Sequence, residues 1–149
     1  MKSMVVIEDI IDYISGLWAY VMEHEWEYFF YASKDIADRA SSWIFPFATI
    51  VTKDNEYDNL SNLNRPDMFR LNININKEIF DQLITVKKTT SWLGAYQNSG
   101  IDFSAVNTIF PHPIYGSMNW ISIINPSSKI FLTLQTYLSE WYNNQKKQY

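Results

Sequence analysis

The stretch from Phe45 to Ile75 reads FPFATIVTKDNEYDNLSNLNRPDMFRLNINI. Its first part, Phe45–Thr52, has β-branched and aromatic residues on both faces, which is typical of a central strand that is covered on both sides. Its last part, Met68–Ile75, alternates with a strict period of two, so apolar residues share one face and Arg70, Asn72 and Asn74 share the other. The sequence therefore predicts two strands joined by a charged loop. One face of the second strand should meet helices, and the other should meet water or a ligand.

The residues before this stretch predict a helix and one more strand. Apolar residues recur at helical spacing from Ile7 to Val21, and Gly16 marks either a bend or an early end of the helix. The aromatic run Trp26–Ala32 has the composition of a strand. Residues 33–42 are small and polar without a clear period, which is compatible with a loop or a short helical turn.

The second half of the chain is predicted to contain five segments. They are a helix over Lys77–Ile84 capped by Asn76, a loop over 85–100, a helix over Phe103–Phe110 capped by Asp102, a strand over Trp120–Ile124, and a closing helix that starts from a cap at Asn125 and from Pro126. Loops between the first strands are too short for crossover helices, which favours antiparallel pairing. We expect an α+β two-layer sandwich with an antiparallel sheet of about four or five strands and helices packed on one face.

Composition limits the class of protein. The 149 residues fit one domain, 1–149, and the net charge of −4 argues against a main task of neutralising phosphates. The chain has no cysteine, which excludes disulfides, thiolate nucleophiles and zinc ribbons. Glu8, Asp9 and Asp12 interrupt the apolar residues near the N-terminus, so we expect no signal peptide, no membrane span and a cytoplasmic location. Aromatic residues reach 17%, so some of them should line a pocket or an interface.

Four ordered motifs carry a resemblance to a known family. They are Pro46–Asp54, Asn64–Ile73, Pro111–Gly116 and Trp120–Pro126. Together they resemble a bacterial family of unknown function, DUF6194, over about residues 7–142. In the family pattern a Trp-Gly-Asp stands where this chain has Trp26-Glu27-Tyr28, and a glycine stands at Asp67. The resemblance implies an MmcQ/YjbR-like two-layer fold, whose members have been suggested to bind DNA, and it implies no activity.

His112 and the loop after the second strand supply candidate site residues. His112 lies between two prolines with Tyr115 nearby, and it is a candidate general base or ligand contact; the alternative is a rigid turn in which the imidazole bonds the backbone. Lys53, Asp54 and Arg65 flank one loop, where they could bind an anion or form an ion pair that holds the loop.

The polar face of the second strand is a further candidate. If Trp120 and Ser122 point the same way as Arg70, Asn72 and Asn74, this face could stack and hydrogen-bond a small planar ligand. The alternative is a solvated face or a homodimer interface. His24 stands between Glu23 and Glu25, but neighbours in sequence point in different directions, so we expect no metal site there. Glycine-rich phosphate loops and catalytic motifs are missing, and we expect no cofactor.

These observations favour a ligand-binding or protein-interaction module that is not an enzyme. The alternative is an enzyme that acts on a small anionic substrate, with His112 as acid or base and with Lys53 and Arg65 around the substrate. Weak nucleic-acid binding, by analogy of fold, is the third possibility. The alternatives differ in whether Lys53, Arg65, Arg70, His112 and Trp120 share one concave surface.

Overall fold

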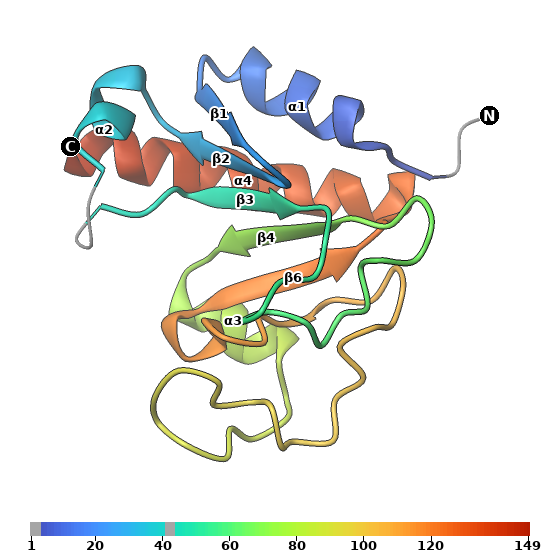
Figure 1. Ribbon diagram of the computed structural model, residues 1–149. Helices are drawn as coiled ribbons and strands as arrows, with labels where there is room; N and C mark the ends of the chain where they lie inside the picture. Colours follow the sequence, from blue (N-terminus) through green and yellow to red (C-terminus); the bar gives the residue numbers. More distant parts are fainter. Residues whose placement is uncertain (1–3, 41–43) are drawn as a thin grey trace.

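The computed structural model describes residues 4–40 and 44–149, which form helices and one antiparallel sheet (Figure 1). The described strands are β1 (Tyr20–His24), β2 (Glu27–Tyr31), β3 (Ala48–Val51), β4 (Arg70–Asn74), β5 (Phe110–Pro111) and β6 (Trp120–Ile124). The helices are α1 (Ile7–Gly16), α2 (Lys34–Asp38), α3 (Lys77–Leu83), α4 (Ser128–Gln148) and the 3-10 turn η1 (Gly116–Met118). The prediction of a mixed α and β protein with an antiparallel sheet is confirmed.

The sheet has six strands in the order β1-β2-β3-β4-β6-β5, so the expected number of four or five was too low. One additional strand is β1. Helix α1 ends at Gly16, the earlier of the two ends that the sequence allowed, and Trp18 then adopts a left-handed backbone with φ 71°. This reversal lets Tyr20–His24 pair with β2, where the apolar spacing alone suggested that the helix continues to Val21.

The second additional strand replaces a predicted helix. Residues Phe103–Phe110 are not helical, because the Asp102 side chain closes only a turn with the backbone N–H and hydroxyl of Ser104. Val106 instead forms an isolated parallel bridge with Ile124, and Phe110–Pro111 pair with β6. Pro111 lacks an N–H donor, which is tolerated because β5 lies at the edge of the sheet.

The closing helix begins later than predicted. Its N-cap is Ser127, whose Oγ accepts a hydrogen bond from the Ile130 N–H at 3.3 Å. Asn125 does not cap the helix; its side chain accepts from the Phe69 N–H at 3.0 Å and donates to the Asp67 carbonyl at 2.9 Å. Asp67, where the family pattern has glycine, has a left-handed φ of 58°, a region that aspartate enters more readily than most residues.

The other predicted elements are found, with ends that differ by at most three residues. Strand β6 and helix α3 lie where expected, and the Asn76 side chain caps α3 by accepting from the Ile79 N–H at 2.8 Å. Of the segment 33–42, the described part contains the short helix α2, and residues 41–43 lie outside the described residues, as do residues 1–3 of the N-terminal segment. The longest strands of the prediction, Phe45–Thr52 and Met68–Ile75, shorten to β3 and β4.

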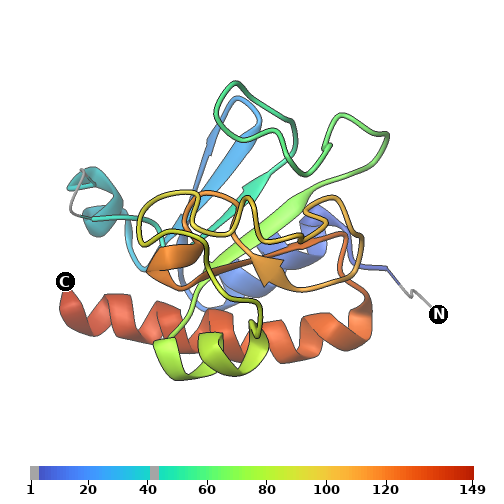
Figure 2. The same cartoon turned by 90° about the horizontal axis from the view of Figure 1, so that it is seen from below.

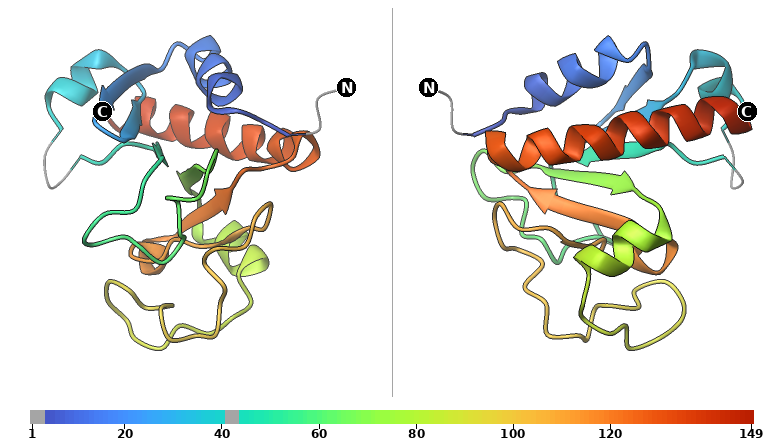
Figure 3. Two further views of the ribbon diagram at one scale, coloured as in Figure 1. Left: turned by 45° about the vertical axis from the view of Figure 1, so that its right-hand side comes forward. Right: turned by 180° about the vertical axis from the view of Figure 1, so that it is seen from behind.

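Helix α4 runs across the sheet with α1 beside it (Figure 3, right). The ring of Tyr13 on α1 meets the edge of Phe131 on α4 at a centroid distance of 6.0 Å, and the Tyr13 hydroxyl donates to the Gln135 carbonyl. Near its other end α4 carries Gln145, which is buried and bonds both the Ala32 N–H and the Phe45 carbonyl. This helix therefore fastens α1, β2 and the chain before β3.

The polar side chains of β4 are not on an open face. Arg70 and Asn72 are both 0% exposed, because the loop over 52–69 crosses the sheet on the side away from α4 (Figure 2). The expectation of water against these two residues was therefore wrong. Ser61 and Leu63 of this loop are themselves buried, so the loop is a packed part of the structure.

Among the described residues, no helix combines the length and the apolar character needed to cross a lipid bilayer.

Candidate functional site

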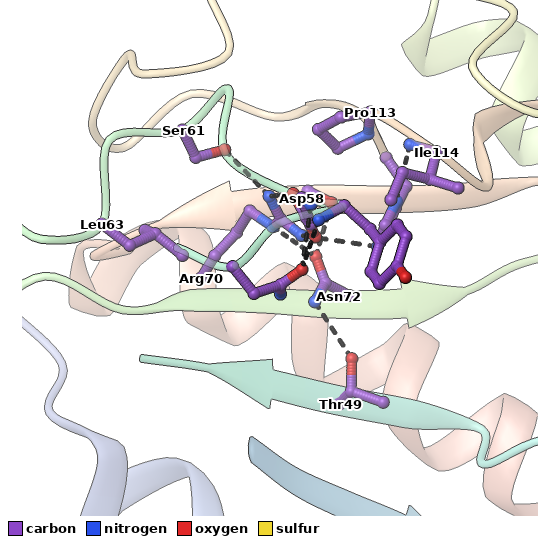
Figure 4. A network of polar contacts seen from close by, with 12 residues as sticks. Thr49, Asp58, Ser61, Leu63, Arg70, Asn72, Pro113 and Ile114 are labelled. Carbon is purple, nitrogen blue, oxygen red and sulfur yellow. Dashed lines mark hydrogen bonds and ion pairs between the residues drawn. The ribbon is translucent and has the colours of Figure 1, made fainter. Parts of the chain in front are cut away.

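Arg70 is the centre of a buried polar network (Figure 4). Its guanidinium faces the Asp58 carboxylate in a two-pronged pair: Nη1 donates to Oδ1 at 2.9 Å, and Nη2 donates to Oδ2. Nη1 also donates to the Ser61 hydroxyl at 2.9 Å, and Nε donates to the Asn72 side-chain carbonyl at 2.9 Å. A buried charge is stable only when it is paired and hydrogen-bonded in this way. Arg70 thus fixes the covering loop onto β4.

Asn72 extends the network across the sheet. Strand register places it opposite Thr49 of β3 and Ser122 of β6. Its Nδ2 donates to the Thr49 hydroxyl at 3.0 Å, and its Oδ1 accepts from the Ser122 hydroxyl at 2.6 Å. Three neighbouring strands therefore present one row of mutually satisfied polar groups, which leaves little freedom for any of these side chains to rotate.

His112 is 5% exposed and closes the network from the segment after β5. Its Nδ1 accepts from the backbone N–H groups of Ile114 and Tyr115 at 3.0 and 3.1 Å, so the proton of the neutral ring belongs on Nε2. Nε2 lies 3.5 Å from Arg70 Nη2, which is also a donor, so this contact is not a hydrogen bond in the neutral ring. Burial, and then the charge of Arg70, hold the pKa of His112 well below 6.5.

A pocket of about 300 Å³ opens above this network. Its polar lining is formed by Glu27, Thr49, Asn55, Asp58, Asn72 and His112. Its aromatic lining is formed by Phe29, Phe45, Tyr57, Tyr115 and Trp120. These lining residues belong to β2, β3, β4, β6, the loop over 52–69, the chain before β3 and the residues after β5. The tertiary fold therefore assembles the pocket from distant parts of the chain.

Glu27 stands at the start of β2 and points into this pocket. Burial raises the pKa of Glu27, and the nearby Asp58 carboxylate raises it further. Within the described residues, no lysine or arginine side chain lies within ion-pair distance of it. The pocket therefore contains one carboxylate whose charge no neighbouring cation pairs.

Comparison with known proteins gives one match. The model of a family described as "Family of unknown function (DUF6194)" matches residues 2–149. This chain belongs to the DUF6194 family. No curated protein and no solved structure matches it significantly. The family resemblance read from the motifs is thus confirmed, and family membership by itself assigns no activity to this DUF6194 protein.

The structure brings together some of the predicted site residues of this DUF6194 protein. Asn72, His112, Tyr115 and Trp120 line the pocket, and Arg70 lies behind its floor in contact with Asp58, Asn72 and His112. Trp120 and Ser122 share a face with Asn74 and Asn72, as the strand register requires. The polar stripe and the Pro111–Trp120 segment therefore meet in one site.

Lys53, Asp54 and Arg65 do not line this pocket. Arg65 donates to the backbone carbonyls of Ser61, Asn62 and Ser104, and the Asp54 carboxylate accepts from the Leu63 N–H at 2.9 Å. Lys53 Nζ lies 5.9 Å from the centre of the Trp26 ring. Arg65 and Asp54 hold the covering loop through backbone contacts, and Lys53 approaches the Trp26 ring. The convergence of Lys53 and Arg65 with His112, which the enzyme alternative requires, is not found.

Sequence reasoning missed Glu27, Thr49, Asp58 and Ser61. A buried arginine needs a carboxylate partner, but the alternation of Met68–Ile75 placed Arg70 on a face toward water or a ligand, so Asp58 had no usable signal. The loop offers Asp54, Glu56, Asp58 and Asp67, and nothing in their spacing selects among them. His24 lies on β1 opposite Glu27, and among residues 4–40 and 44–149 no cluster of three or more histidine or acidic side chains is arranged to hold a metal ion.

Proposed function

We propose that this DUF6194 protein binds a small organic molecule in the pocket over β2, β3, β4 and β6. The observation that carries the proposal is the combination of a pocket of about 300 Å³, an aromatic lining and a floor of fixed polar groups. Small-molecule sites are typically concave, start at about this volume and place a few polar groups among apolar ones. The proposal includes a single-domain, cytoplasmic protein with the two-layer arrangement implied by the family resemblance.

The rigidity of the floor supports binding as the main role. Arg70, Asn72, Ser122 and Thr49 are hydrogen-bonded to one another before any ligand arrives. A site that needs no reordering loses less conformational entropy when the ligand binds.

The geometry at His112 does not favour the enzyme alternative. A general base needs a free lone pair, but Nδ1 already accepts two backbone N–H groups, and Nε2 carries the proton of the neutral ring. A general acid near neutral pH needs a protonated ring, whereas the pKa of His112 lies well below 6.5. His112 is better suited to fix the turn over Pro113 and to present a neutral N–H group.

A thermal-shift screen tests the proposal. The library contains small neutral, acidic and basic compounds, and a ligand at 100 times its Kd is expected to stabilise the protein by about 2.7 kcal/mol. Each hit is then measured by titration calorimetry on Tyr57→Ala and on Trp92→Ala. Tyr57 lines the pocket and is 80% exposed, so its removal should not harm the fold.

Weaker binding to Tyr57→Ala, with unchanged binding to Trp92→Ala, is the expected result. Trp92 is 69% exposed and lies outside the pocket. Trp92→Ala therefore measures the effect of removing an exposed aromatic side chain that does not line the pocket. A library without any hit, or hits that bind both variants as tightly as the original protein, would overturn the proposal.

A further inference from the structure

We infer that the ligand of this pocket is a small organic cation, such as a primary or quaternary amine, held by the Glu27 carboxylate against the aromatic lining. This inference rests on the proposed function and names the chemical class that the pocket takes. It follows from the charge of the pocket, from its rings and from the state of His112.

The charge of the lining is negative. Glu27 and Asp58 are its acidic residues, and no lysine or arginine is among the lining residues. Arg70, behind the floor, is paired with Asp58 through both carboxylate oxygens, so it balances that charge. Glu27 has no such partner within the described chain. A ligand cation would supply the missing counter-charge, whereas an anion would be repelled by the unpaired Glu27 carboxylate.

The rings are suited to the same class. Phe29, Phe45, Tyr57, Tyr115 and Trp120 line the pocket. Aromatic faces carry negative electrostatic potential and attract ammonium groups, particularly where water is excluded. A pocket with one carboxylate and several rings therefore discriminates a cation from a neutral molecule of the same shape by two independent interactions.

His112 does not oppose this assignment. It lines the pocket but stays neutral, because a second positive charge beside Arg70 in a buried position is unfavourable. Its Nε2–H lies 3.5 Å from Arg70 Nη2, which is itself a donor and cannot accept this hydrogen. A ligand that also carries a hydroxyl or carbonyl oxygen could accept from this group, which would orient the molecule with its cationic end toward Glu27.

The experiment compares ligands that share a hydrophobic body and differ in the charge of the head group. Choline is paired with its neutral isostere 3,3-dimethylbutanol, and phenethylamine is paired with 3-phenylpropionate. Binding is measured by calorimetry on the full chain, on Glu27→Gln and on Glu56→Gln. Glu56 is exposed and does not line the pocket, so its variant reproduces the change in net charge without touching the site.

The expected result is binding of at least one cation, with the neutral and anionic partners clearly weaker. Loss of a charge-assisted contact in Glu27→Gln should weaken the cation roughly 10- to 100-fold, and Glu56→Gln should leave it unchanged. Lowering the pH should weaken binding as Glu27 takes up a proton. The pKa of Glu27 also depends on the charges of Asp58, Arg70, His24 and Glu25, and none of these four residues is changed in the variants.

The other outcomes separate the two proposals. Neutral or anionic library compounds that bind in the pocket while the cations do not would overturn the inference and leave the proposed function intact. Cations that bind Glu27→Gln as tightly as the original protein would overturn the role of Glu27. No binding by any compound of any charge would overturn both proposals.

Discussion

Arg70 holds a full positive charge at a position that water does not reach. Its side chain is 0% exposed, and Asp58, Ser61 and Asn72 accept its hydrogen bonds. Lysine could not replace it, because a single ammonium cannot reproduce the planar fork that meets both oxygens of Asp58. The residue therefore fixes both the covering loop and the floor of the pocket.

Replacing Arg70 with methionine should lower the free energy of unfolding by about 3–5 kcal/mol, because the Asp58 carboxylate would remain buried without its partner. Urea unfolding followed by circular dichroism measures the change. Arg39→Met is the matched control: Arg39 pairs with Asp35 on the surface, with a side chain that is 46% exposed, and such pairs contribute about 0–1 kcal/mol. Equal losses in the two variants would contradict the central role of Arg70.

His112 should make the protein sensitive to acid. The folded protein holds the pKa of His112 well below 6.5, so as the pH falls through 6.5 the unfolded chain binds a proton that the folded chain does not. The free energy of unfolding should therefore fall by up to about 1.4 kcal/mol per pH unit, until the pH reaches the pKa of the folded state.

His112→Asn should remove this dependence and keep the turn, because its side-chain carbonyl can accept from the Ile114 and Tyr115 N–H groups as Nδ1 does. Urea unfolding at several pH values between 7 and roughly 5 measures the slope. His24→Asn, at an exposed position of β1, is the control for removing a histidine. A slope in His112→Asn equal to that of the original protein would contradict the prediction.

At the scale of elements, the side chain of Gln145 hydrogen-bonds the C-terminal part of α4 to two other segments of the chain. The Gln145 carbonyl accepts from the Ala32 N–H at 2.8 Å, and its amide donates to the Phe45 carbonyl at 2.7 Å. Phe45 also lines the pocket, so the position of the helix end and the shape of the pocket are linked.

Gln145→Ala should destabilise the protein by about 1–3 kcal/mol, because the buried Ala32 N–H would lose its acceptor. Thermal unfolding measures the loss. Gln148→Ala, three residues later and exposed, removes a glutamine from the same helix and should cost much less. If the two variants melt at the same temperature, Gln145 does not fasten the helix end.

The elements that could be predicted from the sequence were those whose signal lies in a few neighbouring residues. The alternation in β4 and the cap at Asn76 are visible in a few neighbouring residues, and both were predicted. Strand β1 depends on a left-handed Trp18, and β5 depends on pairing with β6. Neither leaves a periodic signal in its own residues, so the helical spacing before Val21 and the apparent cap at Asp102 were misleading.

The same distinction applies to the site at the scale of the molecule. Arg70, Asn72, His112 and Trp120 were candidates because each belongs to a recognisable motif. Asp58 and Glu27 became relevant only when the loop over 52–69 and strand β2 were placed beside β4. Charge complementarity across the fold is not encoded in sequence spacing, so the acidic character of the pocket could not be predicted.

Glu27 should lower the stability of the whole molecule near neutral pH. The folded state raises the pKa of Glu27 above its ordinary value of 4.5, so as the pH rises above 4.5 the unfolded chain loses this proton first and the free energy of unfolding falls. Glu27→Gln should therefore unfold at a higher urea concentration than the original protein at pH 7, and the difference should disappear in acid. A less stable Glu27→Gln at pH 7, with Glu56→Gln unchanged, would contradict this.

The arrangement around Arg70 has a consequence for how the protein folds. Its partners come from residues 58, 61 and 72, with His112 in contact, so their full set exists only when distant parts of the chain have come together. A partly folded state with β3, β4 and β6 paired but the loop open would lose the contacts of Arg70 with Asp58 and Ser61 and the burial of Leu63. Such a state should be sparsely populated, so loop and sheet should form in one cooperative transition. The Leu63 N–H, held by Asp54 inside this loop, should then exchange with solvent only through global unfolding.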